Sequence, residues 1–214
     1  MGPGPRMSPG LRAADAPANQ RMSSRTLQRL VFAASLLPLV WLAWTAATRG
    51  LGANPIDAIT DATGTWTLRF LLLTLAVTPL RRVTGWNAII GYRRMLGLFA
   101  FFYGVLHLST YVVLDQFFAL DLILKDVVKR PFITAGAAAL LLMVPLALTS
   151  TAASIRRLGG RAWRRLHQLV YVSATLGVVH YYWLVKADTT RPLRYAAVLA
   201  VLLGLRVAWR ARGR

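Results

Sequence analysis

The sequence predicts an all-α membrane protein, a bundle of about six transmembrane helices with both termini in the cytoplasm. Three observations support this prediction. Of the 214 residues, 56% are hydrophobic, and the mean hydropathy of +0.49 exceeds what a single soluble core of this size needs. Apolar runs of about 20 residues, enough to cross about 30 Å of hydrocarbon, recur along the chain. Basic residues gather in alternate segments between those runs.

Six apolar runs are the predicted spans. They cover residues 30–48, 65–80, 95–114, 132–151, 166–185 and 192–209. The second and sixth contain Arg69 and Arg206, each near one end, where a long side chain can reach the interface. Residues 1–28 are rich in Gly, Pro, Ala and Arg and lack apolar periodicity, which predicts a disordered cytoplasmic tail. Residues 29–210 form the predicted membrane domain, and 211–214 form a short basic cytoplasmic end.

The distribution of charge predicts the orientation and argues against a nucleic-acid partner. The chain has 26 Lys and Arg against 7 Asp and Glu, a formal charge of +19. With the amino terminus inside, most of the basic residues fall on the cytoplasmic side, and six of the seven acids fall on the opposite side. The cytoplasmic arginines would be Arg6, Arg12, Arg21, Arg25, Arg29, Arg81, Arg82, Arg93, Arg94, Arg156, Arg157, Arg161, Arg164, Arg165, Arg206, Arg210, Arg212 and Arg214. A protein built for nucleic acid would gather this charge on one surface rather than in every second loop.

The three histidines, His107, His167 and His180, are the candidate functional residues. The chain has no cysteine, so any redox chemistry needs a bound cofactor. Buried histidines can serve helix packing alone, but ionisable groups within membrane spans are costly and usually functional. His107 and His180 lie 13 and 15 residues after the arginine pairs that begin the third and fifth spans. At the rise of an α-helix these positions are about 20 and 22 Å deep.

Because the third and fifth spans run in the same direction, His107 and His180 share one level in the membrane. A planar porphyrin between two parallel helices needs one axial nitrogen on each of its faces. The pair therefore predicts a haem whose iron is held by His107 and His180. Gly104 and Gly177 lie three residues before the two histidines, where they would leave room for a porphyrin edge or serve ordinary helix packing.

His167 lies two residues beyond Arg165, near the predicted cytoplasmic surface. On a straight helix it does not face the same way as His180. We treat it as a secondary candidate: it would ligate a weaker second haem, substitute for a primary ligand, or bind a propionate or quinone near the inner surface. A zinc or copper site made from all three histidines is disfavoured, because at most two of them lie close enough to share one ion.

Three stretches of the chain resemble a known family. They are GYRRMLGLFAFFYGVLHLSTYVVLD (91–115), KRPFITAG (129–136) and LTSTAASIRRLGGRAWRRLHQLVYVSATLGVVHYYW (148–183). Together they are similar to the MsrQ (YedZ) family, the haem-binding membrane subunits of the periplasmic protein-methionine-sulfoxide reductase system, within the ferric-reductase-like transmembrane superfamily. The resemblance runs from about residue 29 to the carboxyl terminus and identifies 29–210 as a ferric-reductase-like haem domain.

The resemblance implies cofactors, partners and a location. It implies haem b held by His107 and His180, with His167 as a further position, and FMN as a second cofactor. Electrons would come from the quinone pool or a cytoplasmic flavin reductase, in the bacterial inner membrane. They would pass to a periplasmic molybdopterin-containing methionine sulfoxide reductase catalytic subunit, which forms a heterodimer with this chain and repairs oxidised proteins. This chain would be an electron-transfer subunit without catalytic residues of its own.

Two alternatives stay open at the level of sequence. One is a stand-alone ferric or cupric reductase, which requires the outer haem edge to be exposed to free metal chelates. The other is a non-redox membrane scaffold in which the histidines only pack between helices. The motifs and the place of the histidines within spans favour electron transfer over both.

Overall fold

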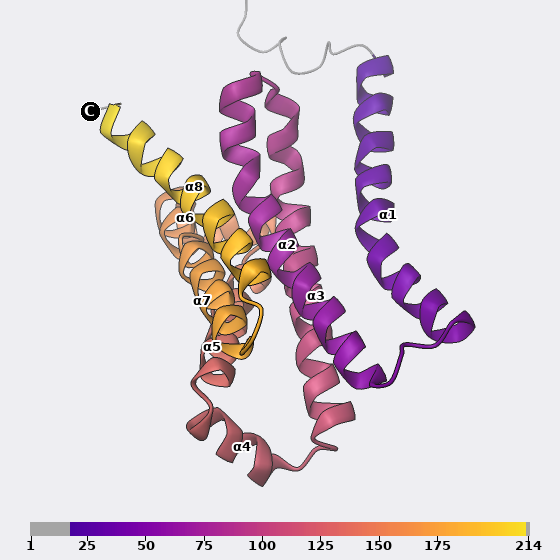
Figure 1. Ribbon diagram of the computed structural model, residues 1–214. Helices are drawn as coiled ribbons and strands as arrows, with labels where there is room; N and C mark the ends of the chain where they lie inside the picture. The colour runs from indigo at the N-terminus through magenta and orange to yellow at the C-terminus, as the bar shows by residue number, and fades with distance from the viewer. Residues whose placement is uncertain (1–17, 213–214) are drawn as a thin grey trace, which may run out of the picture. The chain divides into compact units, whose positions relative to one another are not determined.

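The computed structural model describes residues 18–212, with side chains from residue 25, and within this range all regular structure is helical. The chain divides into two units, residues 1–37 and 38–214, which are described separately. In order, the helices are α1 (Ala18–Thr48), α2 (Pro55–Thr84), the 3-10 helix η1 (Asn87–Tyr92), α3 (Arg93–Ser109), the π-helical turn η2 (Thr110–Asp115), α4 (Leu120–Lys129), α5 (Pro131–Leu148), α6 (Ala152–Leu166), α7 (Leu169–Leu184) and α8 (Thr190–Arg212) (Figure 1). The predicted all-α membrane fold is confirmed.

The first helix begins earlier than the sequence predicts. α1 starts at Ala18, whereas the predicted tail extends to residue 28. Six of the eleven residues 18–28 are Gln, Arg, Met or Leu, which are good helix formers, and a helix already fixed by an apolar span extends at little cost. α1 passes from one unit into the other at Pro38. The rest of the predicted tail, up to residue 17, and residues 213–214 at the other end lie outside the described residues.

Each of the six predicted spans coincides with a helix. Within the described residues, four helical stretches are long and apolar enough to cross a membrane: Arg25–Thr48, Asn87–Asp115, Pro131–Leu148 and Thr190–Arg212. α7 is apolar but has only 16 residues, or about 24 Å. α2 is longer but carries many threonines, whose hydroxyls donate to carbonyls one turn earlier, as in the bond from Thr74 to Phe70. These internal bonds let a polar helix occupy the interior of the bundle without unpaired groups.

Two helix pairs form the centre of the larger unit: α2 packs along α3, and α5 packs along α7 (Figure 1). Between α2 and α3, the Phe70 ring stacks on Phe99 and Tyr103, with centroid separations of 5.7 and 5.3 Å. Between α5 and α7, small residues allow close approach, and the Ser173 hydroxyl donates to the Ala139 carbonyl at 2.9 Å. α8 then packs against both α2 and α7. One helix of each pair carries a histidine: α3 carries His107, and α7 carries His180.

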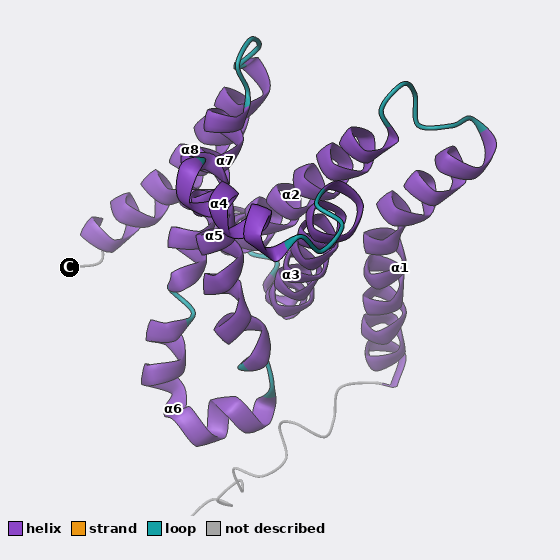
Figure 2. Cartoon of the chain, turned by 90° about the horizontal axis from the view of Figure 1, so that it is seen from below, coloured by secondary structure: helices purple, strands orange, loops and turns teal. Residues whose placement is uncertain are grey.

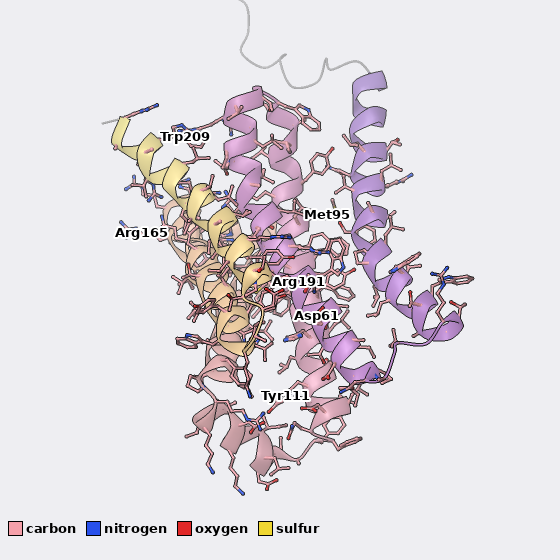
Figure 3. The ribbon with its side chains drawn as sticks, in the orientation of Figure 1. Asp61, Met95, Tyr111, Arg165, Arg191 and Trp209 are labelled. Atoms are coloured by element: carbon pink, nitrogen blue, oxygen red, sulfur yellow. The ribbon has the colours of Figure 1, made fainter. Side chains whose placement is uncertain are left out.

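Short amphipathic helices connect the spans at two points where the sequence analysis predicts no helix. α4 follows the π-helical turn η2 and is held to it by a hydrogen bond of 3.0 Å from the Tyr111 hydroxyl to the Asp126 carboxylate. Tyr111, next to α4, and Trp209, near the end of α8, lie at opposite ends of this unit (Figure 3). Which of these ends faces the cytoplasm stays a prediction from the charges.

The second connector, α6, bends at Gly159, where φ is +73° and a side chain would be strained (Figure 2). Ile155 and Leu158 are exposed apolar residues on this helix. Its basic residues are Arg156, Arg157, Arg161, Arg164 and Arg165, and it has no acid. An apolar face combined with this basic face is typical of a helix that lies in the membrane interface.

The interior position of α2 can be tested by substituting one buried and one exposed leucine of this helix. Leu75 is 0% exposed and Leu73, on the same helix, is 47% exposed. We expect Leu75→Ala to lower the free energy of unfolding by about 2–5 kcal/mol, because it leaves a cavity between packed helices. The matched Leu73→Ala substitution should change it by about 0.5 kcal/mol or less. Unfolding by sodium dodecyl sulfate, followed by circular dichroism, measures both, and equal losses would contradict the interior position of α2.

Candidate functional site

The rings of His107 and His180 meet between α3 and α7. Their centroids are 6.0 Å apart, and the ring planes are inclined at 76°. The sequence analysis placed these two residues at one depth, and the structure brings their side chains together. The nearest neighbours of the pair come from the other helix of each packed pair, α2 beside His107 and α5 beside His180.

Each imidazole donates a hydrogen bond to a backbone carbonyl of the neighbouring helix. Nδ1 of His107 lies 3.0 Å from the carbonyl oxygen of Thr60 on α2, and Nδ1 of His180 lies 2.6 Å from that of Phe132 on α5. A carbonyl oxygen only accepts, so Nδ1 carries the proton in both rings. This leaves the lone pair of Nε2 available on each ring, which is the tautomer that a metal-binding histidine needs.

Two glycines make the close approach of the rings possible. A Cβ atom on Gly64 would lie 2.9 Å from Cε1 of His107, and one on Gly136 would lie 2.8 Å from Nδ1 of His180. Gly64 is four residues after Thr60, and Gly136 is four residues after Phe132. Residues four apart lie on one helix face, so each ring covers a glycine and reaches the carbonyl one turn before it. The same arrangement therefore occurs twice, once on each side of the pair.

The glycines that the sequence analysis expected beside the histidines have another role. A Cβ on Gly104 would lie 2.9 Å from Leu140 Cδ1, and one on Gly177 would lie 3.6 Å from Leu68 Cδ1. Both therefore face packed side chains of neighbouring helices. The expectation that they leave room for a porphyrin edge is wrong, and ordinary helix packing explains them.

The separation of the rings fits two ligands of one metal. Imidazoles bonded to opposite sides of an ion at about 2.0 Å hold their ring centroids about 6 Å apart, close to the separation found here. Within residues 18–212, no three His, Cys, Asp or Glu side chains are grouped so that they could hold a metal ion. A donor set of two imidazoles suits the axial positions of a macrocycle better than a tetrahedral zinc site.

His167 is not part of this pair. It follows α6, where its Nε2 lies 3.0 Å from the Thr149 hydroxyl and its ring stacks on Trp163 at a centroid distance of 3.9 Å. The Trp163 indole donates to the Thr149 carbonyl at 2.9 Å. These contacts tie α6 to the end of α5. The secondary ligand role predicted for His167 stays a prediction.

Comparison with known proteins identifies the family. Residues 63–178 match the family described as ferric reductase like transmembrane component. Three curated relatives carry the name protein-methionine-sulfoxide reductase heme-binding subunit MsrQ. They are from Herminiimonas arsenicoxydans (53% identity, covering 86% of this chain and 85% of the relative), Azospira oryzae (55%, 87% and 80%) and Rhodospirillum rubrum (54%, 86% and 88%). The chain belongs to the MsrQ family. The resemblance seen in its motifs is thereby confirmed.

In this MsrQ-family chain, sequence reasoning missed several parts of the site. Gly64 and Gly136 could have been recognised only by pairing each with a histidine on a different helix. The backbone carbonyls of Thr60 and Phe132 leave no signal in the side-chain sequence. Apart from the pair, a cavity of about 360 Å³ lined by residues of α2, α7 and α8 was also missed, although Arg69, an arginine within a predicted span, was the available indication.

Proposed function

We propose that this chain is the electron-carrying membrane subunit of a methionine sulfoxide reductase system, and that His107 and His180 hold the iron of a b-type haem. The names of its relatives and the family match support a haem-binding subunit. The observation that carries the assignment of the ligands is the pair of facing imidazoles, each with Nδ1 fixed by a carbonyl. Haem, when bound, supplies a one-electron couple of its iron.

In this function the protein would orient the two imidazole rings and shield them from water. The carbonyls of Thr60 and Phe132 fix the tautomer and the direction of each ring, and they increase the basicity of the ligating nitrogen. Helices place ligands more accurately than loops do, and both histidines lie within helices. Both rings are partly buried between helices, and a site poor in water would lower the cost of reorganisation when charge moves.

The remaining parts of the proposal follow the family resemblance. Electrons enter from the quinone pool or a cytoplasmic flavin reductase, with FMN as a further cofactor. They leave to a periplasmic subunit that contains molybdopterin and reduces oxidised methionine, in the bacterial inner membrane with both termini cytoplasmic. The excess of arginines in alternate segments supports this orientation.

The ligand assignment predicts the haem content of single variants. We expect His107→Ala and His180→Ala to lose most of the bound haem, because each removes one of the two axial nitrogens. His167→Ala should keep a substantial part, since this ring contacts Thr149 and Trp163 and not the pair. Haem per protein is measured from the Soret band and the pyridine haemochrome of purified protein. Full retention in either of the first two variants contradicts the assignment.

The glycine positions give a second, independent prediction. Gly64→Ala and Gly136→Ala place a methyl group where the ring of a histidine lies, so the ring must move away from its carbonyl. We expect haem affinity to fall by about 10–100-fold, as when an outer-shell partner of a ligand is lost. Gly177→Ala adds the same methyl group one turn from His180 at an ordinary contact distance, and it serves as the matched control. Similar affinity in all three variants would reject the arrangement.

The acceptor distinguishes electron transfer to a partner from reduction of free metal. Protein reduced anaerobically is mixed in a stopped-flow instrument with the periplasmic reductase subunit encoded by the same organism, and separately with ferric citrate. We expect rapid reoxidation of the haem by the subunit and slow reoxidation by ferric citrate. Faster reaction with ferric citrate would favour a ferric reductase, and the absence of any Soret band would leave the scaffold alternative.

A further inference from the structure

The arginines of α6 have no counterion within residues 18–212. The helix contains five arginines and no acid, and all five are exposed. The acids that form ion pairs in this part of the chain are Asp61, Asp121 and Asp126, and none of them pairs with a residue of α6. Five positive charges therefore lie close together on one short connector without compensation.

Gly159 divides α6 into two halves, each with an apolar and a basic side. In the first half, Ile155 and Leu158 are three residues apart and share a face, with 36% and 44% of their surfaces exposed. By helical periodicity, Arg156 and Arg157 lie on the opposite face. The second half has an apolar side made of Ala162, Trp163 and Leu166 and a basic side made of Arg161, Arg164 and Arg165.

Both ends of α6 are fixed beside the spans α5 and α7. Three residues connect α6 to α5, and two connect it to α7. The two connections meet at Thr149, whose hydroxyl lies 3.0 Å from Nε2 of His167 and whose carbonyl accepts from the Trp163 indole at 2.9 Å. Leu148, the last residue of α5, is 72% exposed. The lipid-facing surface of this span therefore reaches to within four residues of α6.

The bend in α6 keeps the helix close to this surface. A straight helix of the 15 residues in α6 would be about 22 Å long, whereas packed helices such as α5 and α7 lie about 8–10 Å apart. The non-helical backbone at Gly159, where φ is +73°, turns the chain back so that it can begin at one span and end at the other. Figure 2 shows α6 extending to one side of α5 and α7 rather than along them.

We propose that α6 is a binding surface for the headgroups of anionic phospholipids in the adjoining leaflet. The inference goes beyond the proposed function and does not depend on haem. The apolar sides enter the boundary between headgroups and acyl chains by about 5–10 Å, and the guanidinium groups stay at the level of the phosphates, whose oxygens match their paired donors. A soluble acidic protein would also neutralise the arginines, but the bilayer already adjoins both ends of α6 and offers an apolar and an anionic layer together.

The test uses full-length holoprotein in nanodiscs and the absence of cysteine from the chain. A polarity-sensitive fluorophore is attached at Leu158→Cys on the apolar side or, as the matched position, at Ala153→Cys on the opposite side of the same half. Bromine on the acyl chains of either phosphatidylglycerol or phosphatidylcholine quenches a label that contacts that lipid. We expect the Leu158 label to be quenched, more strongly by the glycerol lipid, and the Ala153 label to stay in water.

Substitution of single arginines measures the part played by the headgroup, with the label at position 158. We expect Arg157→Gln and Arg161→Gln each to need about fivefold more brominated phosphatidylglycerol for half-maximal quenching, the usual weight of one arginine near an anionic surface. Arg161→Lys keeps the charge and should resemble the unchanged protein. Arg210→Gln, near the end of α8, is the matched control outside α6. The Soret band shows that each variant still holds its haem.

Equal quenching by the two brominated lipids overturns the inference, and so do glutamine variants of α6 that behave like Arg210→Gln. A Leu158 label that stays in water in every disc places α6 away from the bilayer and overturns it as well. Protection of such a label by an added soluble flavin reductase would assign the basic side to a protein instead. The histidine assignment is tested separately, by the haem content of His107→Ala and His180→Ala.

Discussion

The hydrogen bond from each imidazole to a backbone carbonyl is the constraint on which the site depends. In an apolar bundle a polar ring must find a partner, and an α-helix offers a carbonyl on its surface only where side chains leave access to it. Gly64 and Gly136 provide that access on α2 and α5. The rings of His107 and His180 then point away from their carbonyls and toward one another. The positions of the two rings therefore depend on two residues that lack a side chain.

Much of the architecture could be predicted because it depends on the length of the apolar runs and on the regular rise of an α-helix. Apolar runs located the spans, and the step of 1.5 Å per residue placed His107 and His180 at one depth without knowledge of the packing. The second span was a weaker prediction because Arg69 lies within it. The structure adds that α2 contains threonines that bond to their own helix. α4 and α6 were missed because they are short and amphipathic, and their apolar faces are shorter than a span.

The surroundings of the histidines could not be predicted in the same way. Which glycine faces which ring depends on how α2 packs against α3 and α5 against α7, and a single helix contains no information about its neighbour. Gly104 and Gly177 were predicted to lie beside a porphyrin because they are near the histidines in sequence, yet both face leucines. Gly64 and Gly136 are 43 and 44 residues away from the rings they touch. Proximity in sequence was therefore misleading about proximity in space.

The division of the centre between two helix pairs bears on how the protein is made. α2 and α3 together already contain His107, its carbonyl and its glycine, and α5 and α7 contain the equivalent set for His180. Helices that enter a bilayer in sequence can associate as they arrive, so each pair could form its half of the centre separately. On the proposed ligand assignment, iron held by both imidazoles would join these two halves, and insertion of the cofactor would follow the packing of each half.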